Sequence, residues 1–210
     1  VSQEKIRYML GLSYLYIKNP TEAIKQFDFL RRDKWQYLSY HRSLTHRPDR
    51  QADPPPLDLS PDPYHMRMRD LMRVDLLLGE SYYSEGRLSE AAATLVDYLE
   101  STRTPAVERT LGEHTVEPDN EARFQALDLL GKIYWELARE SYVALKRARA
   151  GRAGEETLEN QRVGWQELLT KGRQYLLELQ TPDYQIYDTS NARLRLAEIH
   201  YRLGERDQVL

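Results

Sequence analysis

Apolar residues recur three and four positions apart along most of the chain, and a small residue stands inside several of these runs. This spacing places the apolar side chains on one helix face, and the small residue lets a second helix approach closely. The pattern predicts paired helices near 7–40, 64–101 and 121–180, followed by an incomplete pair at 190–210. We therefore expect an all-α fold.

Two of these segments carry the same residue types at the same spacings. A glycine is followed by an aromatic residue after three positions, by an alanine after twelve and by a large apolar residue four further on. The positions are Gly11, Tyr14, Ala23 and Phe27 in the first copy and Gly79, Tyr82, Ala91 and Leu95 in the second. Weaker copies begin at Gly131 and Ala197. Each copy predicts a helical hairpin that must stack on a neighbour to bury its apolar face.

Turn residues separate the two helices within each predicted hairpin. Gly86 stands where a left-handed helix end is needed, and Ser89 opens the helix that follows. In the first copy, the segment from Asn19 through Pro20 to Glu22 is expected to end one helix and begin the next.

The Leu-Gly, Tyr, Gly, Ala and Phe positions at these offsets resemble the tetratricopeptide repeat. The resemblance covers 7–30 and 73–100 well, and it extends to 124–143 with a displaced second helix near 165–179, and to 190–210. It implies an α-solenoid of about four stacked antiparallel hairpins in one domain, residues 1–210. The family period of about 34 residues is not kept. Signature positions 11, 79, 131 and 197 lie 68, 52 and 66 residues apart, so insertions must fill the difference.

Three insertions are expected between the repeated helices. The first, near 45–63, is rich in proline and predicts polyproline II or a loop that acts as a linker or docking strap. The second, from Thr102 to Asn120, predicts a loop, and the third, from Ala148 to Gly154, separates a long helix from the one that holds Trp165. The chain starts without an initiator Met and stops inside a predicted helix, which indicates a fragment of a longer protein.

Composition and motifs disfavour several classes of function. A formal net charge of -3 gives no overall attraction to nucleic acid, and the absence of Cys removes thiolate metal sites and cysteine nucleophiles. No apolar run approaches the roughly 20 residues of a membrane helix. The five His are not paired at helical spacing, and no nucleophile or phosphate-binding motif occurs. We expect no enzyme activity, metal or cofactor, while the compartment, cytoplasm or bacterial periplasm, stays open.

Two further features allow more than one interpretation. His200 occupies a repeat position that usually holds an aromatic residue, which favours a structural role over a ligand role. The basic run from Lys146 to Arg152 either ends a helix in solvent or meets phosphate or an acidic partner. The solvent-exposed helix end is the favoured interpretation.

In the tetratricopeptide family the first helices of the hairpins line a concave surface, so the resemblance implies a partner surface there. One register position recurs as Leu15, Tyr83, Trp135 and Tyr201. The predicted partner-binding set consists of Tyr8, Tyr16, Arg73, Glu80, Tyr83, Lys132, Trp135, Glu198 and Tyr201. Rigid aromatic residues beside mixed charges suit a peptide groove. The alternative is that insertions fill the groove and these aromatic residues belong to the core.

One ligand class of the family is disfavoured. Its clamp for acidic C-terminal tails uses Lys and Asn, but the corresponding positions here hold Tyr8 and Leu12. The resemblance therefore implies a scaffold for another protein or peptide partner. The alternatives are a constitutive structural subunit, as in a bacterial envelope complex gripped through the insertions, and a regulatory appendage of an enzyme whose catalytic domain lies elsewhere.

Overall fold

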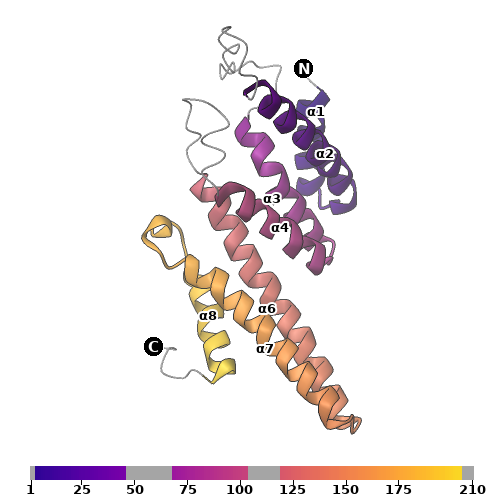
Figure 1. Ribbon diagram of the computed structural model, residues 1–210, viewed down its shortest axis with the longest axis vertical. Helices are drawn as coiled ribbons and strands as arrows, with labels where there is room; N and C mark the ends of the chain where they lie inside the picture. Colours follow the sequence, from indigo (N-terminus) through magenta and orange to yellow (C-terminus); the bar gives the residue numbers. More distant parts are fainter. Residues whose placement is uncertain (1–2, 46–67, 104–118, 205–210) are drawn as a thin grey trace. The chain divides into compact units, whose positions relative to one another are not determined.

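The computed structural model of the protein describes residues 3–45, 68–103 and 119–204 (Figure 1). Over these ranges the chain is helical and contains no strand, which confirms the all-α class. The elements are α1 (Gln3–Tyr16), α2 (Pro20–Thr45), α3 (Met68–Ser84), α4 (Leu88–Arg103), α6 (Asn120–Ala150), α7 (Glu155–Glu178), the 3₁₀ turn η1 (Pro182–Tyr184) and α8 (Ser190–Leu203). Beyond Thr45, the predicted Pro-rich segment at 45–63 lies outside the described residues, as does 104–118 of the second insertion.

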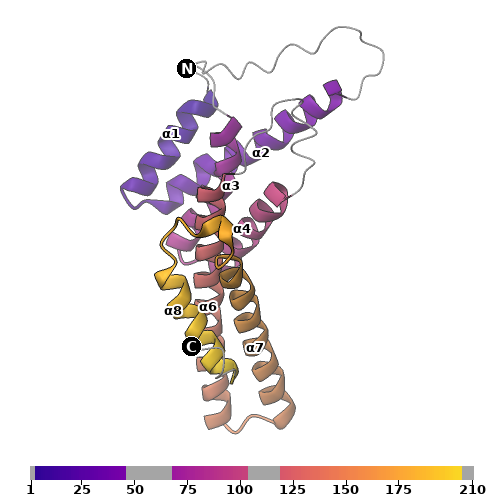
Figure 2. The ribbon, with the colours of Figure 1, turned by 90° about the vertical axis from the view of Figure 1, so that its left-hand side faces the viewer.

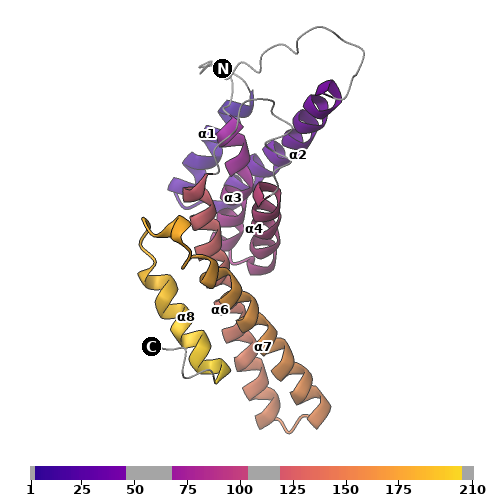
Figure 3. The ribbon, with the colours of Figure 1, turned by 60° about the vertical axis from the view of Figure 1, so that its left-hand side comes forward.

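The chain divides into two compact units, Val1–Asp119 and Asn120–Leu210, called here the N-terminal and C-terminal units. In the N-terminal unit α1 packs on α2, α2 on α3 and α3 on α4 (Figure 2). In the C-terminal unit α6 and α7 form a long hairpin, and α8 packs along α7 while also contacting α6 (Figure 3). Each unit is therefore built from helices that pack mainly on their neighbours in sequence.

The core of the N-terminal unit lies between α2 and α3. Its fully or largely buried members are Ala23, Ile24, Phe27, Leu30, Val74 and Leu78. Tyr8 and Leu12 of α1 and Leu77 and Tyr82 of α3 are half-buried against this cluster. Burying an aliphatic or aromatic side chain of this size contributes about 1.5–3 kcal/mol, so the repeated apolar positions supply most of the attraction between the hairpins.

Glycines in the repeated positions let the paired helices approach closely. A Cβ atom added at Gly11 would lie 2.6 Å from Cε1 of Phe27, and one at Gly79 would lie 2.6 Å from Cδ2 of Leu95. Gly131 of α6 meets a side chain of α7, Leu176, in the same way. The partner follows its glycine by 16 residues in the first two hairpins and by 45 in the third. The α6–α7 hairpin therefore has the same glycine contact, but its helices are longer, so the partner residue lies further along the sequence.

The first helices of the hairpins end in a common backbone geometry. Lys18, Gly86 and Gly204 have φ values of 57°, 80° and 82°, and each follows the small residue of its repeat by seven positions. The Asn19 and Arg87 amides donate to carbonyls five residues earlier, at 2.8 and 2.9 Å, as in a Schellman motif. The prediction of a left-handed end at Gly86 is confirmed.

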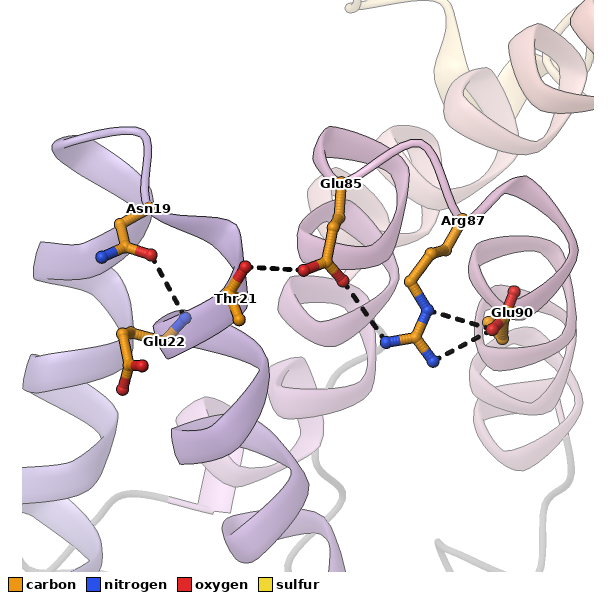
Figure 4. A network of polar contacts seen from close by, with 6 residues as sticks. All are labelled: Asn19, Thr21, Glu22, Glu85, Arg87 and Glu90. Carbon is orange, nitrogen blue, oxygen red and sulfur yellow. Dashed lines mark hydrogen bonds and ion pairs between the residues drawn. The ribbon is translucent and has the colours of Figure 1, made fainter.

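In the first hairpin the left-handed residue is Lys18, and Asn19 has a different role. Its Oδ1 accepts a hydrogen bond of 3.4 Å from the Glu22 amide and so caps the start of α2 (Figure 4). Thr21, in the first turn of α2, donates to Glu85 at 2.6 Å, which links α2 to the turn after α3. This contact is exposed, so we expect it to stabilise the fold only slightly.

Candidate partner-binding site

The C-terminal unit carries an open depression of about 530 Å³. Its lining residues are Tyr142, Lys146, Trp165, Glu198, Tyr201, Arg202 and Gly204. They come from the second half of α6, the first half of α7 and the end of α8, which the packing of these three helices brings together (Figure 3). Three of the seven side chains are aromatic, and aromatic rings offer large contact area with little entropy to lose on binding.

The floor of the depression is an aromatic and cationic stack. The guanidinium carbon of Arg202 lies 4.8 Å from the ring centre of Trp135 and 5.8 Å from that of Tyr142. The rings of Tyr142 and Trp165 are 5.2 Å apart and tilted by 34°. Contacts of a cation with a ring face are attractive at these distances. The stack therefore joins all three helices of the unit and fixes the shape of the floor.

The depression carries charges of both signs. Arg202 forms an ion pair with Glu198 at 2.9 Å. Lys146 lies 4.7 Å from the ring of Tyr142 and is exposed. The α6 side of the depression therefore contributes the positive charge of Lys146. A partner segment with carboxylates beside an apolar side chain would match this arrangement.

Four of the nine predicted partner-binding residues lie in the C-terminal unit. Tyr201 is 64% exposed and lines the depression with Glu198. Trp135 and Lys132 of α6 are half-buried and stand outside the lining set, although the Trp135 ring contacts the lining residue Arg202. Two of the four therefore line the depression, and Trp135 is linked to it through Arg202.

In the N-terminal unit, the predicted residues Tyr8 and Glu80 lie near Arg73, which is also in the predicted set. Tyr8 packs edge-to-face on Phe27 with ring centres 6.4 Å apart, and its burial, with Asp70 nearby, raises the pKa of its hydroxyl. Arg73 pairs with Asp119 and lies near Glu80. Burial raises the pKa of Glu80, and the charge of Arg73 opposes that rise. This group is more enclosed than the depression of the C-terminal unit.

The two remaining predicted residues lie near the ends of their helices. Tyr16 is 89% exposed at the end of α1, and Tyr83 is half-buried near the end of α3. The nine predicted residues are therefore divided between the two units and do not form one surface within either of them. For Tyr8, the contact with Phe27 places part of its ring in the core.

Five lining residues were not among the predicted set, namely Tyr142, Lys146, Trp165, Arg202 and Gly204. Tyr142 is half-buried and lines the depression, whereas Leu145 on the same helix is buried. The available signal is that Tyr142 follows Trp135 by two helical turns and so shares its face. Trp165 carries no such signal, because its position depends on where the α6–α7 turn falls.

His200 is buried in α8, where a structural residue is expected. Over the three described ranges, no group of three or more His, Asp or Glu side chains is arranged to hold a metal ion. None of the helices in these ranges has the length and apolarity needed to cross a membrane.

Comparison with known proteins gives no relative from which a function could be inferred. No protein family, curated protein or solved structure matches the chain.

Proposed function

We propose that the protein is a non-enzymatic interaction scaffold, built as a tetratricopeptide-like α-solenoid of about four hairpins. Its partner is a protein or peptide, and it binds at the depression between α6, α7 and α8. The observation that carries this proposal is the exposed ring of Tyr201 beside Trp165, over a floor that Arg202 holds in place.

Three recurring features support the solenoid. The same glycine-to-large-residue contact occurs in the α1–α2, α3–α4 and α6–α7 hairpins. Lys18, Gly86 and Gly204 end three first helices with the same left-handed geometry. Within each unit, a second helix packs on the first helix that follows it, α2 on α3 and α7 on α8. A chain in which each hairpin contacts its sequence neighbours is typical of helical repeats.

The depression suits a short segment of a partner better than a small molecule. It is open rather than enclosed, and its rim mixes the aromatic ring of Tyr201 with the charges of Lys146 and Glu198. Binding hot spots in protein interfaces are enriched in Trp, Tyr and Arg, and the floor and wall here contain all three types. A partner side chain inserted between Trp165 and Tyr201 would lose its contact with water while adjacent charges fix its orientation.

The alternative of a constitutive structural subunit rests on the insertions at 45–63 and 102–120. Almost all of these segments lie outside the described residues, so no observation favours it over the depression. The structural-subunit alternative predicts a different result in the crosslinking experiment below, because a partner bound through the insertions would not contact residue 201.

The direct test is photocrosslinking in the native source. A benzoylphenylalanine side chain would be introduced at position 201, and a control would carry it at Ile186, which is exposed in the same unit but lies outside the depression. We expect one discrete protein adduct from position 201 and none from position 186. Equal labelling from both positions, or adducts only from position 186, would contradict the proposal.

Substitutions then measure the contribution of the ring. Tyr201→Ala removes an exposed aromatic side chain, and we expect about tenfold weaker capture of the adducted partner, with unchanged helicity. Ile186→Ala is the matched control, because it truncates an apolar side chain that is 86% exposed and lies outside the depression. If both variants retain full capture, recognition belongs elsewhere on the chain.

A further inference from the structure

The outer face of α1 carries an exposed apolar stripe. Ile6, Met9 and Leu10 are spaced by three or four residues, and each is more than two-fifths exposed. Tyr16, the last residue of α1, and Ile17 directly after it continue the stripe and are still more exposed. Contiguous apolar patches on a protein surface mark interaction sites more often than scattered single residues do. This stripe lies in the N-terminal unit and includes none of the residues of the depression.

Helix α3 carries the same stripe in a buried state. Residues 68 positions later, Val74, Leu77 and Leu78, take the places of Ile6, Met9 and Leu10. Val74 and Leu78 are fully buried in the cluster that α3 forms with Ala23, Ile24, Phe27 and Leu30 of α2.

The local hydrogen bonding of the two stripes is also the same. Ser13 donates to the Met9 carbonyl at 2.8 Å, and the equivalent Ser81 donates to the Leu77 carbonyl at 2.7 Å. Ser13 is exposed and Ser81 is buried. The two helices therefore share side chains and local bonds, and they differ in whether a second helix covers the face.

The C-terminal unit repeats this relationship independently. Ala192 and Ile199 of α8 occupy the register positions of Val74 and Ser81, and both are buried. The covering helix is α7, since a Cβ atom added at Gly172 would lie 3.5 Å from Cδ1 of Ile199. In both units, this face of a first helix is covered by the second helix of the hairpin before it.

We propose that the outer stripe of α1 is a docking surface for one amphipathic helix of a partner protein, of the same type as α2 and α7. That helix carries a small residue, a large apolar residue four positions later and another three positions beyond it. Ala23, Phe27 and Leu30 show the pattern in α2, and Gly172, Leu176 and Leu179 show it across the end of α7.

The apolar character of the stripe argues against a solvent-facing end of the repeat array. A helix that closes a repeat array has a polar outer face, because no neighbour covers it. On α1 the corresponding positions hold Ile6, Met9 and Leu10, which match the buried α3 residues in size and polarity. The surface fits a helix lying along α1, with its small residue at the point of closest approach.

A peptide with the sequence of residues 20–32 is the probe. It would carry a fluorescent label and a hydrocarbon staple joining positions 25 and 29, on the face opposite Ala23 and Phe27. We expect saturable one-to-one binding to the whole chain by fluorescence anisotropy. Leu10→Glu and Met9→Glu should each weaken it about tenfold or more, and a peptide with Phe27→Glu should not bind.

The matched control is Leu194→Glu, which makes the same substitution at an exposed leucine of α8. It should bind the peptide as the unaltered chain does, and circular dichroism should show all three variants folded. Both stripe positions are exposed, so at least one variant is expected to fold.

Three outcomes would overturn the assignment. These are the absence of saturable binding, equal binding by the stripe and control variants, and self-association in sedimentation that Leu10→Glu abolishes. The last would identify a second copy as the occupant in place of a partner protein. None of them affects crosslinking from position 201, so this inference and the proposed function fail independently.

Discussion

Gly131 of α6 lies so close to Leu176 of α7 that a side chain on the glycine would overlap the leucine. We expect Gly131→Ala to destabilise the chain by about 2 kcal/mol, because the added methyl group overpacks a buried contact. Leu176→Ala should cost about 3 kcal/mol through the cavity that it leaves. The double variant should be more stable than the sum of the two losses predicts, since the new methyl group enters the space vacated by Leu176.

Gly164→Ala is the control for this prediction. It lies inside α7, and a Cβ atom there meets nothing within 4 Å, so alanine should stabilise the chain by about 0.5–1 kcal/mol through helix propensity. Urea denaturation followed by circular dichroism measures all four variants. Strict additivity of Gly131→Ala and Leu176→Ala would show that the two residues do not share this contact.

At the equivalent turns after α1 and α3, introducing a glycine and removing one should have opposite effects on stability. Lys18 has a φ of 57° that glycine adopts without strain, so Lys18→Gly should stabilise the chain by about 0.5–1 kcal/mol. Gly86 has a φ of 80°, and Gly86→Ala should destabilise by about 1 kcal/mol although the site is open. Thermal melts of the two variants provide the comparison, and shifts of the same sign would contradict the shared geometry.

The repeated contacts could be predicted wherever the sequence keeps its spacing. Phe27 and Leu95 both follow a glycine by 16 residues, so their places against Gly11 and Gly79 are implied by the pattern. Leu176 follows Gly131 by 45 residues, and the sequence locates only the segment 165–179 that contains it. The exact partner depends on the length of both helices, which local propensity does not determine.

The candidate site could also be predicted only in part from the sequence. Tyr201 and Trp135 share a register position, so their common surface follows from the repeat. Trp165 reaches the depression only because α6 and α7 extend past α8 before they turn. Arg202 was not predicted, because the spacing of residues in the sequence does not indicate that a cation stacks on two rings.

Arg31 joins α2 to the next hairpin, and its loss should be much more damaging than that of its neighbour Arg32. Arg31 lies 3.3 Å from the buried carboxylate of Asp75 in α3 and 2.8 Å from Asp97 in α4. Arg31→Met removes the guanidinium that pairs with a buried charge, which typically costs about 3 kcal/mol. Adding Asp75→Asn should recover part of this loss, because the charge is removed as well.

Arg32→Met is the matched control for that prediction. The Arg32 side chain is 80% exposed and pairs with Asp28 at 3.5 Å on the helix surface, so its loss should change stability by less than about 0.5 kcal/mol. Chemical denaturation separates the two outcomes. Equal effects of the two substitutions would mean that the contact between α2 and α3 does not depend on the buried ion pair.

Glu80 makes the stability of the N-terminal unit depend on pH in an unusual direction. Its pKa is raised above the ordinary 4.5, mainly by burial, so the folded chain binds its proton more tightly than the unfolded chain does. Stability from this group therefore increases as pH falls from the raised pKa towards 4.5. At neutral pH the charged carboxylate is unfavourable, and Glu80→Gln should be the more stable protein.

The difference between Glu80→Gln and the unaltered chain should shrink as pH falls and vanish below the ordinary pKa, where both side chains are neutral. Glu85→Gln should behave in the opposite way, because hydrogen bonds from Thr21 and Arg87 lower the pKa of Glu85 and favour its charged form. Glu85→Gln should be less stable than the unaltered chain at neutral pH, and the two should become equally stable as pH falls through the lowered pKa of Glu85. Thermal melts from pH 7 to pH 3 test both signs, and a gap for Glu80→Gln that widens in acid would contradict the role assigned to burial.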